Sequence, residues 1–127
     1  MTKIKLSNRE LDIMLVLWNS DRPLAATDIP KCNPQLSVNT VQALLKKLLK
    51  NGYIKVSDII YHGTVLTRIY EPVLSHETYI LSQLQDTPLS SHSLAAALVK
   101  QEKDPKRLDE LKQLIEAQKE ALEKEEG

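Results

Sequence analysis

The first apolar pattern in the chain lies along residues 8–18, where apolar side chains recur every three or four positions, as on one face of a helix. Ser7 and Glu10 have the spacing of a capping box, in which each residue bonds the other's backbone N–H. The helix is therefore predicted to begin at Asn8, and residues 21–23 (Asp-Arg-Pro) end it.

Two further helices are predicted before residue 52. Residues 25–29 indicate a short helix that Pro30 ends, and a turn follows it. A longer helix covers residues 38–50, because its apolar side chains repeat with a strong helical period and Ser37 is a good cap. Asn51-Gly52 supplies the left-handed turn that commonly closes a helix.

The period changes after Gly52. Residues 53–60 are rich in β-branched side chains and alternate roughly between apolar and polar, and residues 65–70 form a second run of this kind. Residues 61–64 between them contain a glycine and indicate a turn. The whole segment, 53–71, is therefore predicted to be a β-hairpin.

Three helices are predicted in the rest of the chain. The first runs from Ser75 to about Gln85, the second covers residues 91–103, and the third begins at Pro105 and runs toward Glu125. The apolar stripe on the last helix spans only two heptads, so this helix would be marginally stable in isolation and must pack against another part of the protein or a partner. A dimer interface is the favoured interpretation, and packing within one chain is the alternative. The residues expected at a dimer interface are Tyr79, Leu84, Leu108, Leu111, Ile115 and Leu122.

The order helix, short helix, helix, hairpin is typical of a winged helix-turn-helix, in which the third element enters the major groove of DNA and the hairpin is the wing. The predicted fold class is therefore mainly α, with an α+β wing. Residues 1–73 are expected to form the DNA-binding domain, and residues 74–127 a helical dimerisation region.

A helix that reads the major groove needs an apolar back and a polar, partly cationic front, and residues 38–50 have both. Amides can bond adenine, lysines suit phosphate or guanine, and a short alanine can approach a thymine methyl. The hairpin is expected to reach the DNA backbone or the minor groove through Tyr61, His62, Thr64 and Arg68, of which His62 and Arg68 are kept as candidate contacts. The candidate DNA-contacting residues are Ser37, Asn39, Thr40, Gln42, Ala43, Lys46, Lys47 and Lys50 of the helix, and His62 and Arg68 of the hairpin.

The formal net charge is zero, but the charges are unevenly distributed. Residues 1–73 carry ten Lys/Arg and six Asp/Glu, whereas residues 74–127 carry seven and eleven. A basic first part and an acidic second part suggest two tasks, although chance and an acidic tail are an alternative. The chain has no Phe, so its core must be aliphatic, and Trp18 is interpreted as a core anchor between the DNA-binding helices rather than a ligand platform.

Three segments resemble a known family. Glu10-Leu-Asp-Ile-Met-Leu-Val-Leu-Trp18 resembles the Glu-x-x-Ile-Met-x-x-Leu-Trp signature that opens the penicillinase-repressor family, the BlaI/MecI/CopY type. Residues 36–48 are similar to the recognition helix of that family, and residues 68–72 to the end of its wing. The resemblance covers about residues 6–85 and implies a dimeric winged-helix repressor, joined through C-terminal helices, that binds palindromic operators.

The chain departs from the family pattern at several positions. Ala43 stands where the family often has Thr, and Lys47 where it often has Arg, whose bidentate fork lysine cannot copy. The copper-sensing branch has a C-terminal cysteine cluster, whereas this chain has only Cys32, which excludes a sensor of that design. The β-lactam branch is cleaved at an Asn-Phe pair that a chain without Phe lacks. The way in which this protein is switched off is therefore open, and a regulatory protease or sensor protein is a candidate partner.

Other kinds of function find little support in the sequence. The chain has no phosphate-binding glycine loop, nucleophile elbow or metal-binding His-Glu-x-x-His, so no enzymatic activity and no cofactor or metal are expected. His62, His76 and His92 lie in three different predicted elements, which argues against zinc. A single cysteine and the lack of a signal peptide or long apolar stretch predict a cytoplasmic protein without membrane contact. The main alternative to DNA binding is a winged-helix module that binds a protein partner.

Overall fold

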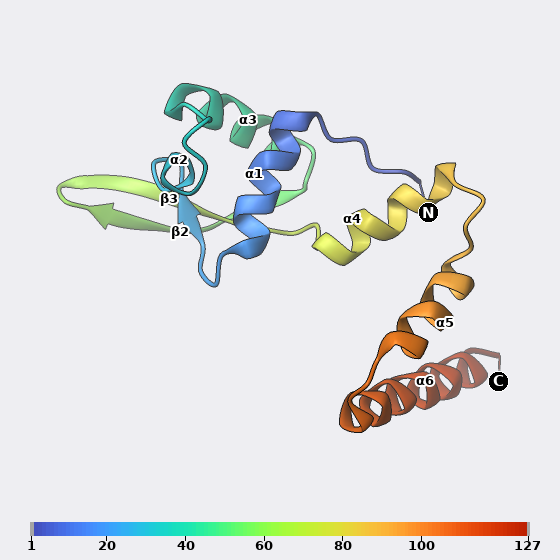
Figure 1. Cartoon of the computed structure of the whole chain (residues 1–127). Helices are drawn as coiled ribbons and strands as arrows, with labels where there is room; N and C mark the ends of the chain where they lie inside the picture. Colours follow the sequence, from blue (N-terminus) through green and yellow to red (C-terminus); the bar gives the residue numbers. More distant parts are fainter. Residues whose placement is uncertain (1, 127) are drawn as a thin grey trace. The chain divides into compact units, whose positions relative to one another are not determined.

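The computed structural model describes residues 2–126, which form two compact units, one ending at Asp86 and the other beginning at Thr87 (Figure 1). The fold is mainly helical with one small antiparallel sheet, as predicted. The elements of the first unit are α1 (Asn8–Asn19), β1 (Leu24–Ala25), α2 (Ile29–Cys32), α3 (Val38–Lys50), β2 (Ile54–His62), β3 (Val65–Pro72), α4 (His76–Gln83) and the short 3-10 helix η1 (Leu84–Asp86). The second unit contains α5 (Ser91–Gln101) and α6 (Pro105–Glu126).

The predicted capping box of α1 is present. The Glu10 backbone N–H donates to Ser7 Oγ at 3.2 Å, and the Ser7 N–H donates to Glu10 Oε1 at 3.0 Å. Two of the N–H groups at the start of the helix are thereby satisfied. Ile13, Met14 and Leu17, on the inner face of α1, are buried in the core of the first unit.

The prediction of a helix over residues 25–29 is wrong. Leu24 and Ala25 form β1, which pairs with Tyr70 and Ile69 of β3, and the short helix α2 begins only at Ile29. Pro30 occupies the first turn of α2, where its missing N–H has no partner within the helix in any case. The proline therefore marks the start of this helix rather than its end.

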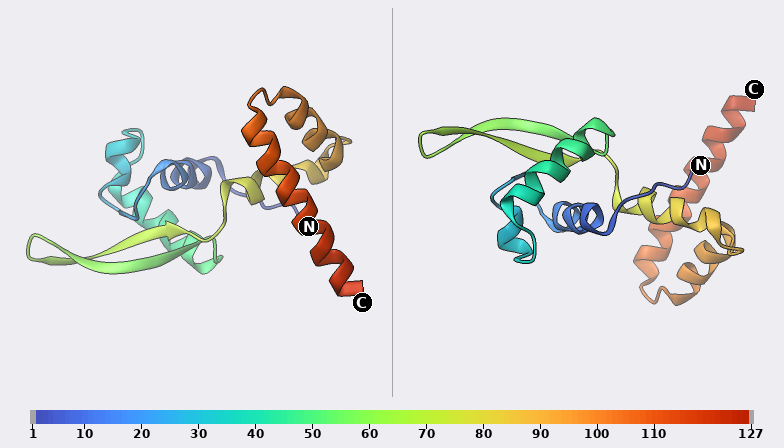
Figure 2. Two further views of the ribbon diagram at one scale, coloured as in Figure 1. Left: turned by 90° about the horizontal axis from the view of Figure 1, so that it is seen from below. Right: turned by 90° about the horizontal axis from the view of Figure 1, so that it is seen from above.

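The sheet has the strand order β1-β3-β2, with all pairs antiparallel. The hairpin of β2 and β3 extends further than predicted, because β2 continues to His62 and only Gly63-Thr64 form the turn. Gly63 has a φ of +66°, as the first central residue of a type II′ turn requires. Both views of Figure 2 show the far end of this hairpin projecting away from α1, α2 and α3.

The core of the first unit is aliphatic and lies between α1, α2, α3 and the base of the sheet. α3 contributes Val41, Leu45 and Leu48, each at most 1% exposed. A glycine with a φ of +79°, Gly52, follows α3 and turns the chain into β2, where Ile54 joins the same core. The recognition helix expected from the sequence is therefore fixed on the core by its apolar side.

Helix α4 belongs to the first unit, so the division of the chain lies after Asp86 and not after residue 73. The reason is a contact between segments far apart in the sequence. The Ile4 N–H donates to Ser82 Oγ at 3.2 Å, and Gln83 Nε2 donates to the Ile4 carbonyl at 2.8 Å. Lys3 Nζ and Asp86 Oδ2 add an exposed ion pair at 2.6 Å.

The second unit differs from the first because none of its described residues, 87–126, is buried. Leu98, Leu114 and Ile115 are 59%, 66% and 56% exposed. Helix α6 begins at Pro105, as predicted from the Asp104-Pro105 pair. No helix within residues 2–126 has the length and apolar character needed to cross a membrane.

Candidate nucleic-acid interface

The candidate interface is centred on α3, which packs against α1 and α2 and leaves its other side in solvent (Figure 1). At its start, Ser37 Oγ accepts the Thr40 N–H at 3.2 Å and donates its own proton to Thr40 Oγ1 at 2.9 Å. The two hydroxyls are thus engaged with each other while remaining exposed. Ser37 fixes the first turn of the helix, and Thr40 Oγ1 keeps its own proton for an external acceptor.

The middle of α3 presents Asn39, Gln42 and Ala43, all of which are exposed. Neither amide side chain forms a hydrogen bond with another described residue. Both carry the paired donor and acceptor that can recognise an adenine edge. The structure therefore brings these three sequence-predicted residues together on one accessible surface.

Three lysines continue this surface toward the end of α3. Lys46 and Lys50 form no ion pair with a described residue, whereas Lys47 Nζ lies 3.9 Å from Glu10 Oε1. The chain has no Asp or Glu between Asp28 and Asp58, a stretch that includes all of α2 and α3. The exposed side of α3 is consequently cationic without nearby acidic residues from its own segment, which suits contact with phosphates.

The wing, formed by β2 and β3, carries the other two predicted contact residues. His62 pairs with Val65 and Arg68 pairs with Ile59 across the strands. Directly paired residues share a face, and faces alternate along a strand, so His62 and Arg68 lie on opposite faces of the hairpin. His62 and Arg68 would therefore reach the DNA from different faces of the hairpin.

The exposure of Val65 and Leu66 on the wing, beside the expected exposure of Tyr61, is a feature that sequence reasoning missed. Tyr61 is 73%, Val65 62% and Leu66 59% exposed. The alternation of residues 53–60 predicted strands but did not reveal that the side chains in the distal half of the hairpin are exposed. The sequence predicted that this strand ends at residue 60, whereas β2 continues to His62. The local pattern gave no sign that the strand continues beyond the core.

The residues expected at a dimer interface fall into two groups. Tyr79 and Leu84 are half-buried in the first unit, where Tyr79 packs against its core. On α6, Leu108 is half-buried, while Leu111, Ile115 and Leu122 are 37%, 56% and 51% exposed. The available apolar surface is therefore on α6, and Tyr79 is better explained by packing within its own chain.

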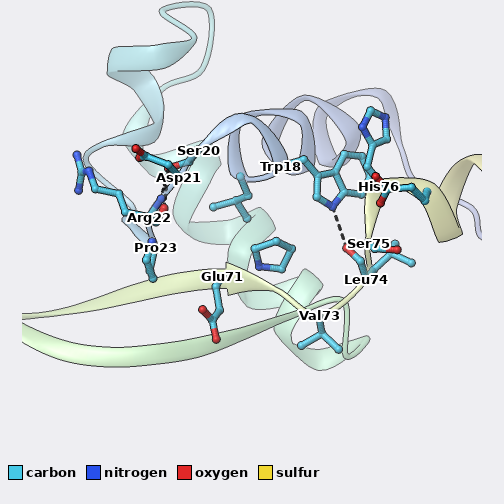
Figure 3. A pocket seen from close by; sticks show the side chains of 13 residues that line it. Trp18, Ser20, Asp21, Arg22, Pro23, Glu71, Val73, Leu74, Ser75 and His76 are labelled. Atoms are coloured by element: carbon cyan, nitrogen blue, oxygen red, sulfur yellow. Dashed lines mark hydrogen bonds between the residues drawn. The ribbon is translucent and has the colours of Figure 1, made fainter. Parts of the chain in front are cut away.

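Trp18 joins α1 to the segment that leads into α4, rather than lying between the DNA-binding helices. Its Nε1 donates to the Leu74 carbonyl at 2.8 Å, and its ring stacks on His76 with 4.4 Å between centroids (Figure 3). Among residues 2–126, no three His, Cys, Asp or Glu side chains gather into a candidate metal site. Cys32 is exposed at the end of α2.

A helix-turn-helix followed by a β-hairpin wing, with a cationic recognition helix, defines the winged-helix class of DNA-binding transcription regulators. The family model described as penicillinase repressor matches residues 6–117. The chain belongs to the penicillinase-repressor family, and the resemblance seen in the sequence is thus confirmed.

Several solved structures are similar to this chain at low identity. PerR from Streptococcus pyogenes is 22% identical, with a TM-score of 0.42, over 54% of this chain and 48% of that one. The adhesin competence repressor AdcR from the same organism is 18% identical, with a TM-score of 0.43, over 94% of this chain and 82% of that one. A mutant of MepR from a multidrug-resistant S. aureus isolate is 15% identical, with a TM-score of 0.39, over 90% of this chain and 77% of the MepR chain. The match to PerR spans about half of the PerR chain. No curated protein matches this chain in sequence.

Proposed function

We propose that this chain is a sequence-specific repressor that binds a palindromic operator as a homodimer, with α3 in the major groove and the β2–β3 wing beside it. The observation that carries the proposal is the exposed side of α3. It combines unpaired amides at Asn39 and Gln42 with cationic Lys46 and Lys50, over a side buried in the core. Amides suit base edges and lysines suit phosphates, so one helix carries both specificity and affinity.

The homodimer is supported by the second unit. Its described residues bury no side chain, yet α6 carries exposed Leu111, Leu114, Ile115 and Leu122 at helical spacing. A helix of this kind gains its stability by burying the apolar face against a partner. A second copy of the chain supplies that partner and gives the two-fold symmetry that a palindrome requires.

The exposed apolar wing favours a second candidate function, a winged-helix module that binds a protein. Ile59, Tyr61 and Leu66 are exposed on one face of the hairpin, because Tyr61 pairs with Leu66 and Ile59 lies two residues before Tyr61. They form an apolar surface that a protein partner could cover. The polar and cationic side of α3 is unsuited to this role, so the module would have to use the wing alone. Release from DNA by a regulatory protease or sensor protein belongs to the repressor proposal only.

The test is a fluorescence-anisotropy titration against a pseudo-palindromic duplex from upstream of the chain's own gene, beside a scrambled duplex, at two salt concentrations. We expect a preference of roughly a thousandfold for the operator duplex. Replacing Lys46 and Lys50 by alanine should weaken binding to both duplexes, whereas the matched Lys112→Ala and Lys119→Ala changes on α6 should leave it unchanged. Wild-type affinity in the α3 variant would overturn the assignment of the recognition helix, and equal, weak binding to both duplexes would favour the protein-binding module.

A further inference from the structure

The first unit contains an open cavity of about 420 Å³ away from the exposed side of α3. Its walls come from the end of α1, the following loop, the end of β3 and the start of α4. Figure 3 shows Trp18 and His76 at one end of it and Asp21, Arg22 and Pro23 at the other. The volume lies within the range of sites that bind small molecules.

The aromatic end of the cavity is held in place by its own contacts. The Trp18 ring is nearly parallel to His76, at an interplanar angle of 6°, and its N–H is already bonded to the Leu74 carbonyl. The indole therefore offers the cavity an apolar edge and no free donor. Leu17, Pro23 and Pro72 extend the apolar lining.

The charged groups of the cavity are mostly acidic. Glu71 Oε1 lies 3.2 Å from Lys55 Nζ, and Arg22 Nη1 lies 4.0 Å from Asp28 Oδ2. Asp21 and Glu77 form no ion pair with a described residue. A ligand that enters the cavity thus meets two carboxylates without a counter-charge, beside an apolar and aromatic lining.

We infer that this cavity binds a small organic cation with an aromatic body. The body would lie against the edge of Trp18 and the prolines, and its positive charge would be attracted by the carboxylates of Asp21 and Glu77. An anion would find Arg22 alone, and that side chain already has Asp28 nearby. The inference does not depend on the DNA-binding proposal, because the cavity involves none of the predicted DNA contacts.

The experiment titrates the full chain with three probes of similar size, namely benzyltrimethylammonium, benzyl alcohol and benzenesulfonate. Trp18 is the only tryptophan of the chain, so its fluorescence and its indole N–H resonance report on this cavity alone. We expect the cation to bind at least about tenfold more tightly than either other probe and to shift the indole resonance. Equal binding of the three probes, tighter binding of the sulfonate, or an unshifted indole resonance would overturn the inference.

Variants assign the binding to the two carboxylates. The double change Asp21→Asn and Glu77→Gln preserves side-chain size and should lower the affinity for the cation by about tenfold, with little effect on benzyl alcohol. The matched change Asp109→Asn and Glu110→Gln on α6 removes the same charge elsewhere and should leave binding unchanged. Thermal unfolding of each variant establishes that it is folded. An unchanged affinity for the cation after the Asp21→Asn and Glu77→Gln changes would mean that the probe binds elsewhere.

Discussion

Lys47 on α3 lies with its Nζ 3.9 Å from the Oε1 of Glu10 on α1, and the Glu10 side chain is only 5% exposed. The same carboxylate oxygen accepts the Ser7 N–H. Burying a carboxylate costs folding free energy unless a positive charge lies nearby. Lys47 therefore contributes to the stability of the first unit through Glu10, whereas Lys46 and Lys50 have no such partner among the described residues. The three lysines of α3 should therefore differ in their contribution to DNA binding.

The first prediction concerns the salt dependence of operator binding. Lys46→Ala and Lys50→Ala should each lower the slope of log affinity against log salt by about 1.8, because each change removes one phosphate contact, worth about 0.9, from both halves of the homodimer. Lys47→Ala should lower it by clearly less, because the Lys47 charge faces Glu10. Anisotropy titrations at four salt concentrations measure the slopes.

A variant of Glu10 can separate the two roles of Lys47, which are pairing with Glu10 and contacting a DNA phosphate. Glu10→Gln keeps a side chain that can complete the capping box but removes the charge. In that background Lys47 is released, and Lys47→Ala should lower the slope by as much as Lys46→Ala does. If Lys47→Ala has the same full effect with Glu10 present, the ion pair does not restrain the lysine.

The cap of the recognition helix gives the second prediction. Ser37→Ala removes the acceptor of the Thr40 N–H and should destabilise the first unit by about 1 kcal/mol. Ser37→Asn, an equally good cap, should restore most of that stability. Chemical denaturation followed by circular dichroism measures both. A restored stability without restored DNA affinity would show that the Ser37 hydroxyl itself contacts the DNA.

The third prediction concerns Gly52, which has a φ of +79° and no atom within 4 Å of the position that a Cβ would occupy. The cost of Gly52→Ala is therefore one of backbone conformation alone, about 1 kcal/mol. Gly52→Asn should cost less, because asparagine adopts this conformation more readily. Equal unfolding free energies for glycine and alanine would mean that the turn relaxes.

The fourth prediction tests the dimer surface of α6. Ile115→Glu and Leu122→Glu place charges in the exposed apolar stripe and should shift the chain from dimer to monomer, measured by sedimentation equilibrium. The changes Glu116→Gln and Glu123→Gln lie beside them on the same helix and should leave the dimer intact. If the Ile115→Glu and Leu122→Glu variants keep the molecular mass of a dimer, the dimer interface lies elsewhere.

The fifth prediction concerns Asp86. The hydrogen bond and charge of Lys3, helped by Lys5, lower the pKa of this carboxyl below its usual range. The ion pair therefore favours the folded state above the ordinary pKa of aspartate, near 4, and this contribution is lost as pH falls through the lowered pKa. Lys3→Met should raise the pKa of Asp86 toward the ordinary value, measured by carboxyl NMR titration, and an unchanged pKa would contradict the pairing.

The parts of the fold that the sequence predicted correctly depend on local rules. The box of Ser7 and Glu10, the apolar period of α3 and the glycine of the hairpin each act within a few residues. The failures depend on contacts between distant segments. Ala25, at the start of a predicted helix, lies instead in a strand because it pairs with Ile69, and a strand partner 44 residues away cannot be inferred from the local pattern.

The candidate site follows the same distinction. The exposed residues of α3 follow from helical spacing alone, so Asn39, Gln42 and the lysines are found on one surface as expected. The placement of Trp18 against Leu74 and the packing of Tyr79 on the core required the path of the chain after β3, which periodicity does not encode. For the same reason, the attachment of α4 to the first unit through Ile4 was not predicted.

The lack of buried residues over positions 87–126 of the second unit has a consequence for how such a regulator would respond in a cell. If α6 completes its packing only with a second copy, the supply of DNA-binding dimers depends on the concentration of the chain. Below the dissociation constant of the dimer, a twofold dilution would leave about a quarter of the dimers. Operator occupancy would then fall more steeply than the amount of protein, and a modest loss of chains would produce a sharp change in transcription.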